Sequence, residues 1–235
     1  MSEISRDVAY SRTEDGAITT SVPLTVVDPD GPRRGAIIVL HEERQFTEPL
    51  LALMHALAAE GWLALAPHLF HRHPEGGAGE VFGDDLFVDV DAALDWLAWR
   101  EVPADTVGVL GFDAAGTATM LVASNRRVGA AVSVAARGID EALTADSRSL
   151  LDVAPALQAP WLGLYGDNDP QTSPDAVNRL RDAVGRAEVA ALVVSYEGLG
   201  HRADATPEKI YENGLESEIV DAKTRIFDWF GSHLR

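Results

Sequence analysis

Short runs of hydrophobic residues alternate along this chain with longer stretches in which hydrophobic residues recur every three or four positions. Residues 35–40, GAIIVL, and 106–110, TVGVL, are continuous apolar runs, which are typical of strands buried on both faces of a parallel sheet. The same pattern predicts further strands at 62–66, 128–135, 160–165 and 189–196.

The longer stretches predict helices. Residues 48–60 are rich in Leu and Ala, and Gly61 follows them as the expected C-terminal cap. Residues 84–100 and 216–234 carry hydrophobic residues on one helical face. Shorter helices are predicted at 114–124 and 173–184.

Repeated alternation of strand and helix predicts an α/β fold, with a mostly parallel central sheet that helices cover on both faces. The first 34 residues are more polar and contain Asp15-Gly16 and Asp30-Gly31, so we expect an antiparallel hairpin there. No repeat or linker interrupts the 235 residues, which predicts a single domain. Functional groups in such sheets gather beyond the carboxyl ends of the strands, so residues that directly follow the apolar runs are the candidates for chemistry.

Composition and charge exclude several classes of function. The chain has 19 Lys and Arg residues and 37 Asp and Glu residues, and its formal charge of −18 repels nucleic-acid phosphates and anionic lipid. It has no cysteine, which excludes disulfides, thiolate catalysis and cysteine-ligated metals. The polar N-terminus has no signal-peptide pattern, and no apolar run reaches about 18 residues. We therefore expect a cytoplasmic monomer or homodimer with no nucleic-acid or membrane partner.

The segment GVLGFDAAGTA, residues 108–118, joins a predicted strand to a predicted helix. Its centre places Asp113 between the small residues Gly111 and Ala115. This spacing is the pattern of a nucleophile elbow, a strained turn at which strand and helix approach closely. We expect the backbone N–H of Ala114 to form half of an oxyanion hole there.

Two other predicted strands end at ionisable residues. YGDNDPQTSP offers Asp169 or Asp167 to orient a histidine, and YEGLGHRAD places His201 in a glycine-containing loop. The chain order of Asp113, acid and His201 is the nucleophile–acid–histidine order of α/β-hydrolases.

With the segment HEERQFTEPLLALMHALAAEGWLALAPHLFHR, residues 41–72, these motifs resemble the dienelactone hydrolase family. The segment is similar to the family's His-Glu, Leu-Ala-x-x-Gly and Ala-Pro-x-Leu segments, and GFDAAG is similar to its Gly-Phe-Cys-x-Gly-Gly elbow. GDNDP and GLGHRAD are similar to its acid and histidine loops. The resemblance covers roughly residues 35–235. It implies an α/β-hydrolase fold and cofactor-independent hydrolysis of esters and lactones, often carboxylate-bearing ones.

The resemblance also implies roles for individual residues. It makes His201 the general base and Asp169, by its Gly-x-x-Asp spacing, the acid that orients His201. Glu42 matches the family's glutamate that contacts the nucleophile.

Four further positions correspond to groups that contact the substrate in the family. Backbone N–H groups near Glu43 and at Ala114 match the oxyanion hole. Arg72 matches an arginine that binds the substrate carboxylate, and Arg202 lies near a second such arginine.

Asp113 departs from the family, which has its usual Cys or Ser nucleophile at this position, and the departure leaves three hypotheses open. The first is a hydrolase of a small ester, lactone or related electrophile, in which Asp113 is the nucleophile or a second acid/base. Glu42 beside Asp113 then raises the pKa of one of the two carboxyls. The second is a dehalogenase-type enzyme in which Asp113 attacks an sp³ carbon, although those branches usually follow the Asp with Trp and Ala114 stands here. The third is a hydrolase fold that binds a ligand or partner without catalysis.

We expect a small-molecule substrate, and we expect neither a metal nor a cofactor. The spacing of His68, His71 and His73 matches no firm metal-site pattern. Gly111 and Gly116 have the spacing of P-loop glycines, but Thr117 stands where that motif needs Lys, and no G-x-G-x-x-G is present.

Overall fold

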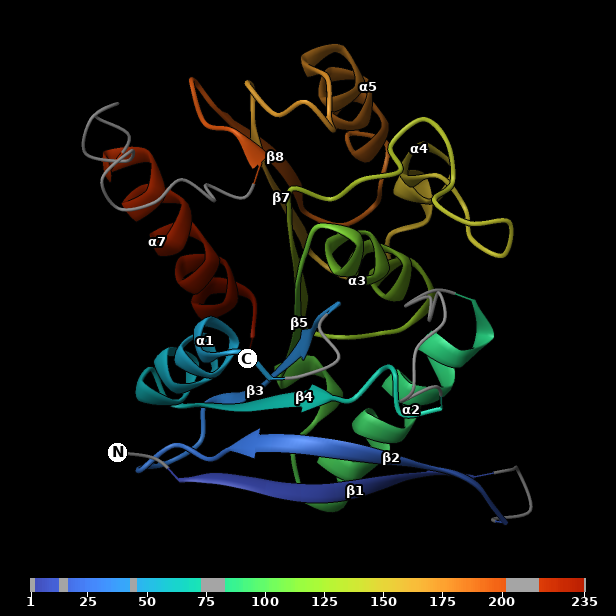
Figure 1. Ribbon diagram of the computed structural model, residues 1–235, viewed down its shortest axis with the longest axis vertical. Helices are drawn as coiled ribbons and strands as arrows, with labels where there is room; N and C mark the ends of the chain where they lie inside the picture. Colours follow the sequence, from blue (N-terminus) through green and yellow to red (C-terminus); the bar gives the residue numbers. More distant parts are fainter. Residues whose placement is uncertain (1–2, 13–16, 43–45, 73–82, 202–215, 235) are drawn as a thin grey trace.

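The strands of the computed structural model form one eight-stranded sheet in the order β1-β2-β4-β3-β5-β6-β7-β8 (Figure 1). The structure describes residues 3–12, 17–42, 46–72, 83–201 and 216–234. The strands are β1 (Ile4–Arg12), β2 (Ile18–Val27), β3 (Gly35–Leu40), β4 (Trp62–Pro67), β5 (Val107–Phe112), β6 (Ala130–Val134), β7 (Trp161–Gly166) and β8 (Ala191–Tyr196).

Strand pairing confirms the predicted mixture of an entry hairpin and a parallel sheet. β1 pairs with β2, and β2 with β4, in antiparallel fashion, whereas all pairs from β4 through β3 to β8 are parallel. The structure differs from prediction at β5, which runs on to Phe112 because β6 continues to pair with it there. The strand therefore ends directly before Asp113.

Helices cover both faces of the sheet, as predicted. α1 and α7 lie on one face, and α2, α3, α4 and α5 lie on the other (Figure 1). The helices are α1 (Glu48–Ala59), α2 (Asp84–Trp99), α3 (Ala114–Asn125), α4 (Leu150–Val153), α5 (Pro174–Val184) and α7 (Glu216–His233). The four-residue α4 was not predicted, since a single turn has no hydrophobic period and depends on its Ser149 cap.

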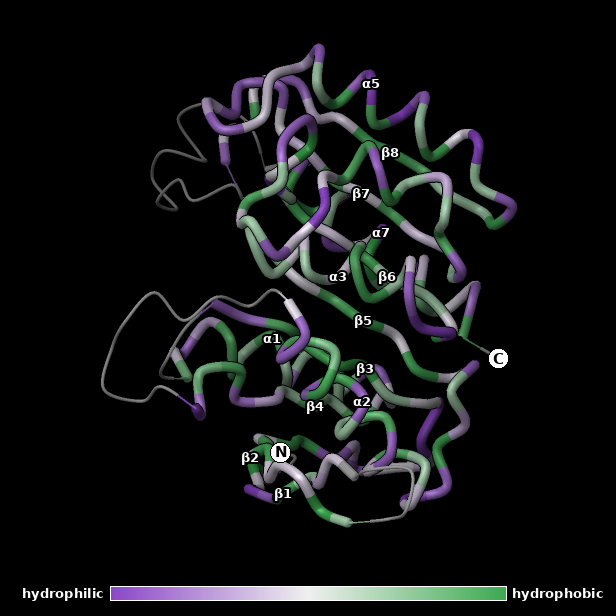
Figure 2. Tube along the Cα trace, turned by 90° about the vertical axis from the view of Figure 1, so that its right-hand side faces the viewer, coloured by the Kyte–Doolittle hydropathy of each residue, from purple (hydrophilic) through white to green (hydrophobic). Residues whose placement is uncertain are grey.

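The hydrophobic core has two layers, one on each face of the sheet. Every residue of β3 and β4 is buried, which is why their sequences are apolar throughout rather than alternating. Figure 2 shows hydrophobic residues along the central strands, whereas hydrophilic residues recur on the turns of α5. At Gly108 an added Cβ would lie 2.6 Å from side-chain atoms of Ile37 and of Phe230, so glycine lets α7 approach the sheet closely.

No helix in the described part of the chain is both long and apolar enough to span a bilayer.

Candidate active site

A strained turn at Asp113 joins β5 to α3. Asp113 has φ 58° and ψ −126°, a backbone conformation that costs about 1–3 kcal/mol for a residue with a side chain. Its N–H donates to the carbonyl oxygen of Val134 at 2.8 Å, which ties the turn to the end of β6. The chain reverses sharply here, as an elbow requires.

Glycines make this turn sterically possible. A Cβ added at Gly111 would lie 2.2 Å from the Ala115 carbonyl oxygen, and one at Gly116 would lie 3.1 Å from the Val134 carbonyl oxygen. Because backbone atoms occupy this space, larger side chains would separate α3 from the strands.

The elbow brings together three residues from distant parts of the sequence. Nε2 of His201 lies 3.1 Å from Oδ2 of Asp113, and Nδ1 of the same ring lies 2.7 Å from Oδ2 of Asp169. Both aspartates are buried. Asp113, Asp169 and His201 follow β5, β7 and β8, whose carboxyl ends share one edge of the sheet.

The loop after β7 fixes the acid. The backbone N–H of Gln171 donates to Oδ1 of Asp169 at 2.7 Å, and the Thr172 hydroxyl donates to Oδ2 at 3.0 Å. Asp167, the other candidate, instead accepts a hydrogen bond from the backbone N–H of Gly198 at 2.7 Å. The structure thus brings Asp169, and not Asp167, to the histidine.

Arg137 completes the cluster and is a residue that sequence reasoning missed. Its Nε forms an ion pair with Oδ1 of Asp113, and its Nη2 lies 3.6 Å from Oε1 of Glu42. The guanidinium therefore bridges the two carboxylates that the sequence suggested as direct neighbours. Arg137 lies two residues after the predicted strand 128–135. Treating residues that follow this strand as candidates for chemistry, as for the other strands, would have found it.

Two local features position Arg137. Ala135 adopts a positive φ of 51°, which turns the chain back after β6. The Thr117 hydroxyl then donates to the Arg137 carbonyl oxygen at 2.7 Å and holds this segment against the first turn of α3.

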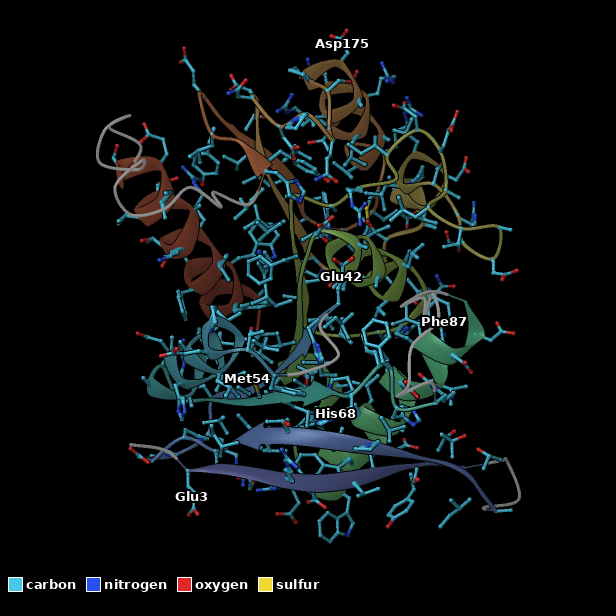
Figure 3. The ribbon with its side chains drawn as sticks, in the orientation of Figure 1. Glu3, Glu42, Met54, His68, Phe87 and Asp175 are labelled. Atoms are coloured by element: carbon cyan, nitrogen blue, oxygen red, sulfur yellow. The ribbon has the colours of Figure 1, made fainter. Side chains whose placement is uncertain are left out.

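The remaining predicted residues lie in different places. Glu42 follows β3, and Figure 3 shows it beside α3 at this edge of the sheet. Ala114 is the first residue of α3, and the first N–H groups of a helix have no partner within the helix. Glu43 and Arg202 lie outside the described residues.

Arg72 pairs with α2 and contacts neither Asp113 nor Glu42 among the described interactions. Its Nη1 and Nη2 lie 2.9 and 2.7 Å from the two carboxylate oxygens of buried Asp89, and Nε lies 3.4 Å from Asp85. Burial acts to lower the pKa of the guanidinium, but the carboxylates of Asp89 and Asp85 outweigh this effect, and the net pKa is raised. A role in binding a substrate carboxylate stays a prediction and requires Arg72 to leave Asp89.

The described residues contain no group of three or more His, Asp or Glu side chains placed to hold a metal ion. His68 shares a hydrogen bond with the Thr25 hydroxyl at 2.9 Å, and burial lowers its pKa to about 4. His71 lies 3.3 Å from Asp89, and His73 is outside the described residues.

An apolar cavity of about 120 Å³ adjoins the site on the α7 face of the sheet. Its lining includes Phe112 and Gly200, which directly precede Asp113 and His201. Ile219 and Ile226 of α7 also line the cavity.

The charges of the cluster favour a protonated histidine. Burial acts to lower the pKa of His201, but its hydrogen bonds to Asp169 and then to Asp113, with the charges of both, raise the pKa above its ordinary value of 6.5. His201 is therefore an imidazolium held between two carboxylates over a wider pH range than a free histidine.

Three comparisons show which known proteins this chain is similar to. The family model described as "Dienelactone hydrolase family" matches residues 22–234. A Salmonella typhimurium (strain LT2) protein named "Putative carboxymethylenebutenolidase" is 27% identical over 210 residues, which are 84% of this chain and 77% of that protein.

Solved structures share the fold. The "Putative Dienelactone Hydrolase" from Klebsiella pneumoniae has a TM-score of 0.77 and 26% identity, covering 97% of this chain and 99% of that one. The Pyrococcus furiosus esterase Pf2001 has a TM-score of 0.73 over 100% of this chain and 92% of that one, and its 14% identity makes it evidence of the fold alone. The predicted α/β-hydrolase fold is confirmed.

The ion pair between His201 and Asp113 makes stability depend on pH. A raised folded-state pKa stabilises the protein below the unfolded value of 6.5, and the contribution is lost as the pH rises through the folded pKa. We expect NMR titration to find the His201 pKa above 6.5 in wild type and lower in Asp113→Asn. The difference in unfolding free energy between the two proteins will be largest below pH 6.5. An unchanged His201 pKa in the variant would contradict the ion pair.

Proposed function

Since the chain belongs to the dienelactone hydrolase family of hydrolases, we propose that it hydrolyses a small ester, lactone or related electrophile without a cofactor. Asp113, His201 and Asp169 form the catalytic site in this proposal. The observation that carries it is the imidazole of His201, which bridges the buried Asp169 and the elbow residue Asp113 at 2.7 and 3.1 Å.

The surroundings of Asp113 favour a role as a base toward water. Both of its oxygens already form ion pairs, with Arg137 at Oδ1 and with His201 at Oδ2, so neither oxygen can approach a carbon atom without breaking one of them. A carboxylate has about four lone-pair directions, so it can still accept a hydrogen bond from a water molecule. Direct attack on an ester carbonyl would give an anhydride, a less favourable intermediate than a water adduct.

Hydrolysis then proceeds by paired acid and base. Asp113 takes a proton from water as the water oxygen attacks the carbonyl carbon, and the carbonyl π electrons move to its oxygen. As the tetrahedral adduct collapses, the ester C–O bond breaks and the imidazolium of His201 gives its Nε2 proton to the leaving oxygen. The proton on Asp113 passes to the neutral His201, which restores both groups.

The other residues of the site position His201 and stabilise the charges that develop during the reaction. Asp169 fixes the ring through Nδ1 and favours the imidazolium. The N–H of Ala114, at the start of α3, supports the developing oxyanion in this mechanism, because the helix N-terminus carries partial positive charge. Arg137 forms ion pairs with both Asp113 and Glu42 and so offsets the repulsion between the two carboxylates.

A second candidate is a hydrolase fold that binds a ligand without turnover. The ion pairs of Arg137 with Asp113 and Glu42 favour it, because they occupy the position at which the family has a reactive nucleophile. This protein would be stabilised by a ligand but would hydrolyse no ester.

The first test is hydrolysis of p-nitrophenyl acetate. We expect the wild type to turn it over and His201→Ala to lose on the order of 10²-fold or more, the usual contribution of a positioned acid or base. His233→Ala, on the last turn of α7, is the matched histidine control and keeps wild-type activity. Equal rates for wild type and His201→Ala would refute the proposed site and leave the ligand-binding candidate.

The pH profile separates this mechanism from one with a neutral histidine base. With His201 as the acid, kcat/KM for the same ester falls as the pH rises through the raised pKa of His201. A histidine base would instead make kcat/KM rise over that range. Rates are measured with the His201→Ala rate subtracted at each pH, and a rising profile would reverse the assigned roles of Asp113 and His201.

Heavy-oxygen labelling identifies the attacking oxygen. In a single turnover in H₂¹⁸O, attack by water places the label in the acid product and none in the peptide that contains Asp113. A covalent ester or anhydride on Asp113 would put ¹⁸O into its carboxylate, as in the dehalogenase-type hypothesis. The peptide that contains Asp169 is the internal control in the same mass spectrum.

A further inference from the structure

Two exposed aromatic side chains lie at the edge of the sheet farthest from β8. Trp99, in the last turn of α2, is 79% exposed, and Tyr10 of β1 is 43% exposed. Trp99 is the most exposed large hydrophobic residue in the described part of the chain. A contiguous exposed apolar patch with polar residues at its rim is typical of an interaction or ligand-binding site.

These residues line a pocket between β1 and α2 with a volume of about 400 Å³, a size in the usual range for small-ligand sites. Asp7, Asp95, Trp96 and Trp99 supply its functional side chains, because the Tyr10 side chain points to the other face of β1 from Asp7. Two indole rings and two carboxylates are thus the chemistry that a ligand would meet.

The carboxylates lie beside the rings. Asp95 and Trp99 are four residues apart on α2 and therefore neighbours on one helical face. Asp7 accepts a hydrogen bond at 3.1 Å from the indole N–H of Trp96. No Arg or Lys side chain that the structure describes forms an ion pair with Asp7 or Asp95.

The two arginines near the pocket pair with neither Asp7 nor Asp95. Arg6 belongs to the opposite face of β1, where its charge acts on His68. Arg100 lies over the Trp96 ring, 4.6 Å from its centroid, and pairs with Asp28 at 3.0 Å. The Arg100 contact shows that one indole of this region already binds a guanidinium through its face.

We propose that the pocket between β1 and α2 binds a small organic cation with a quaternary ammonium or guanidinium group. Aromatic faces attract such cations, and the attraction is strongest for Trp. Asp7 and Asp95 add charge complementarity, and the net charge of −18 favours cation approach. β1 lies four strand positions from β5, roughly 19 Å at about 4.8 Å per strand, so the pocket is separate from the catalytic cluster.

The test uses choline and its neutral isostere 3,3-dimethylbutan-1-ol at constant ionic strength. We expect choline to shift the indole N–H signal of Trp99 saturably in NMR spectra and the isostere to bind at least tenfold more weakly. Trp99→Ala, at an exposed position, loses choline binding at least tenfold, and Asp95→Asn loses about threefold. Ile18→Ala at the exposed start of β2 and Asp84→Asn on α2, both outside the pocket, keep wild-type affinity.

Three outcomes would overturn the proposal. Absence of a saturable shift would show that the pocket binds no such cation. Equal binding of the isostere would make it an apolar site without cation selectivity. Sedimentation that changes from dimer to monomer in Trp99→Ala would make the surface a contact between two copies. Ester hydrolysis measured on the same variants keeps this test independent of the catalytic site.

Discussion

The backbone of Asp113 is held in a conformation that few residues with a side chain adopt, and the arrangement of the site follows from it. With φ 58° and ψ −126°, the chain leaves β5 and enters α3 without an intervening loop. The parallel pairing of β5 with β3 and β6 holds the turn in place. Because the turn presents Asp113 at the carboxyl edge of the sheet, the segments after β3, β6, β7 and β8 can all reach it.

A carboxylate at this position changes the electrostatics of the whole site. A neutral serine or cysteine would leave the histidine free to accept a proton. Asp113 instead brings a carboxylate, which forms ion pairs with Arg137 at one oxygen and with His201 at the other. Asp169 lies on the other side of the same imidazole, so the ring is stabilised as a cation. The acid and base of the proposed mechanism therefore have the reverse of the usual protonation states.

Most arginine ion pairs of the described structure join two segments. Arg72, Arg100, Arg126 and Arg179 each pair with aspartates of one other segment. Arg137 is different, because its two carboxylate partners follow β3 and β5. At the opposite edge of the sheet, Asp7 and Asp95 lie beside exposed aromatic rings. The two regions differ in their cations: Arg137 pairs with the carboxylates at the active site, whereas no described Arg or Lys forms an ion pair with Asp7 or Asp95.

Much of the fold could be read from the sequence, since the apolar runs of β3 and β4 and the one-sided helices α1 and α7 are local patterns. The small residues around Asp113 and the order of Asp113, Asp169 and His201 also follow from local sequence. The family resemblance favoured Asp169 over Asp167, and the structure brings Asp169 to His201. Tertiary structure alone decided that Arg72 pairs with Asp89 and that Arg137 bridges Asp113 and Glu42. Hydrophobic periodicity records how each segment buries its own surface, whereas ion pairs between segments depend on strand order and loop path, which no local pattern contains.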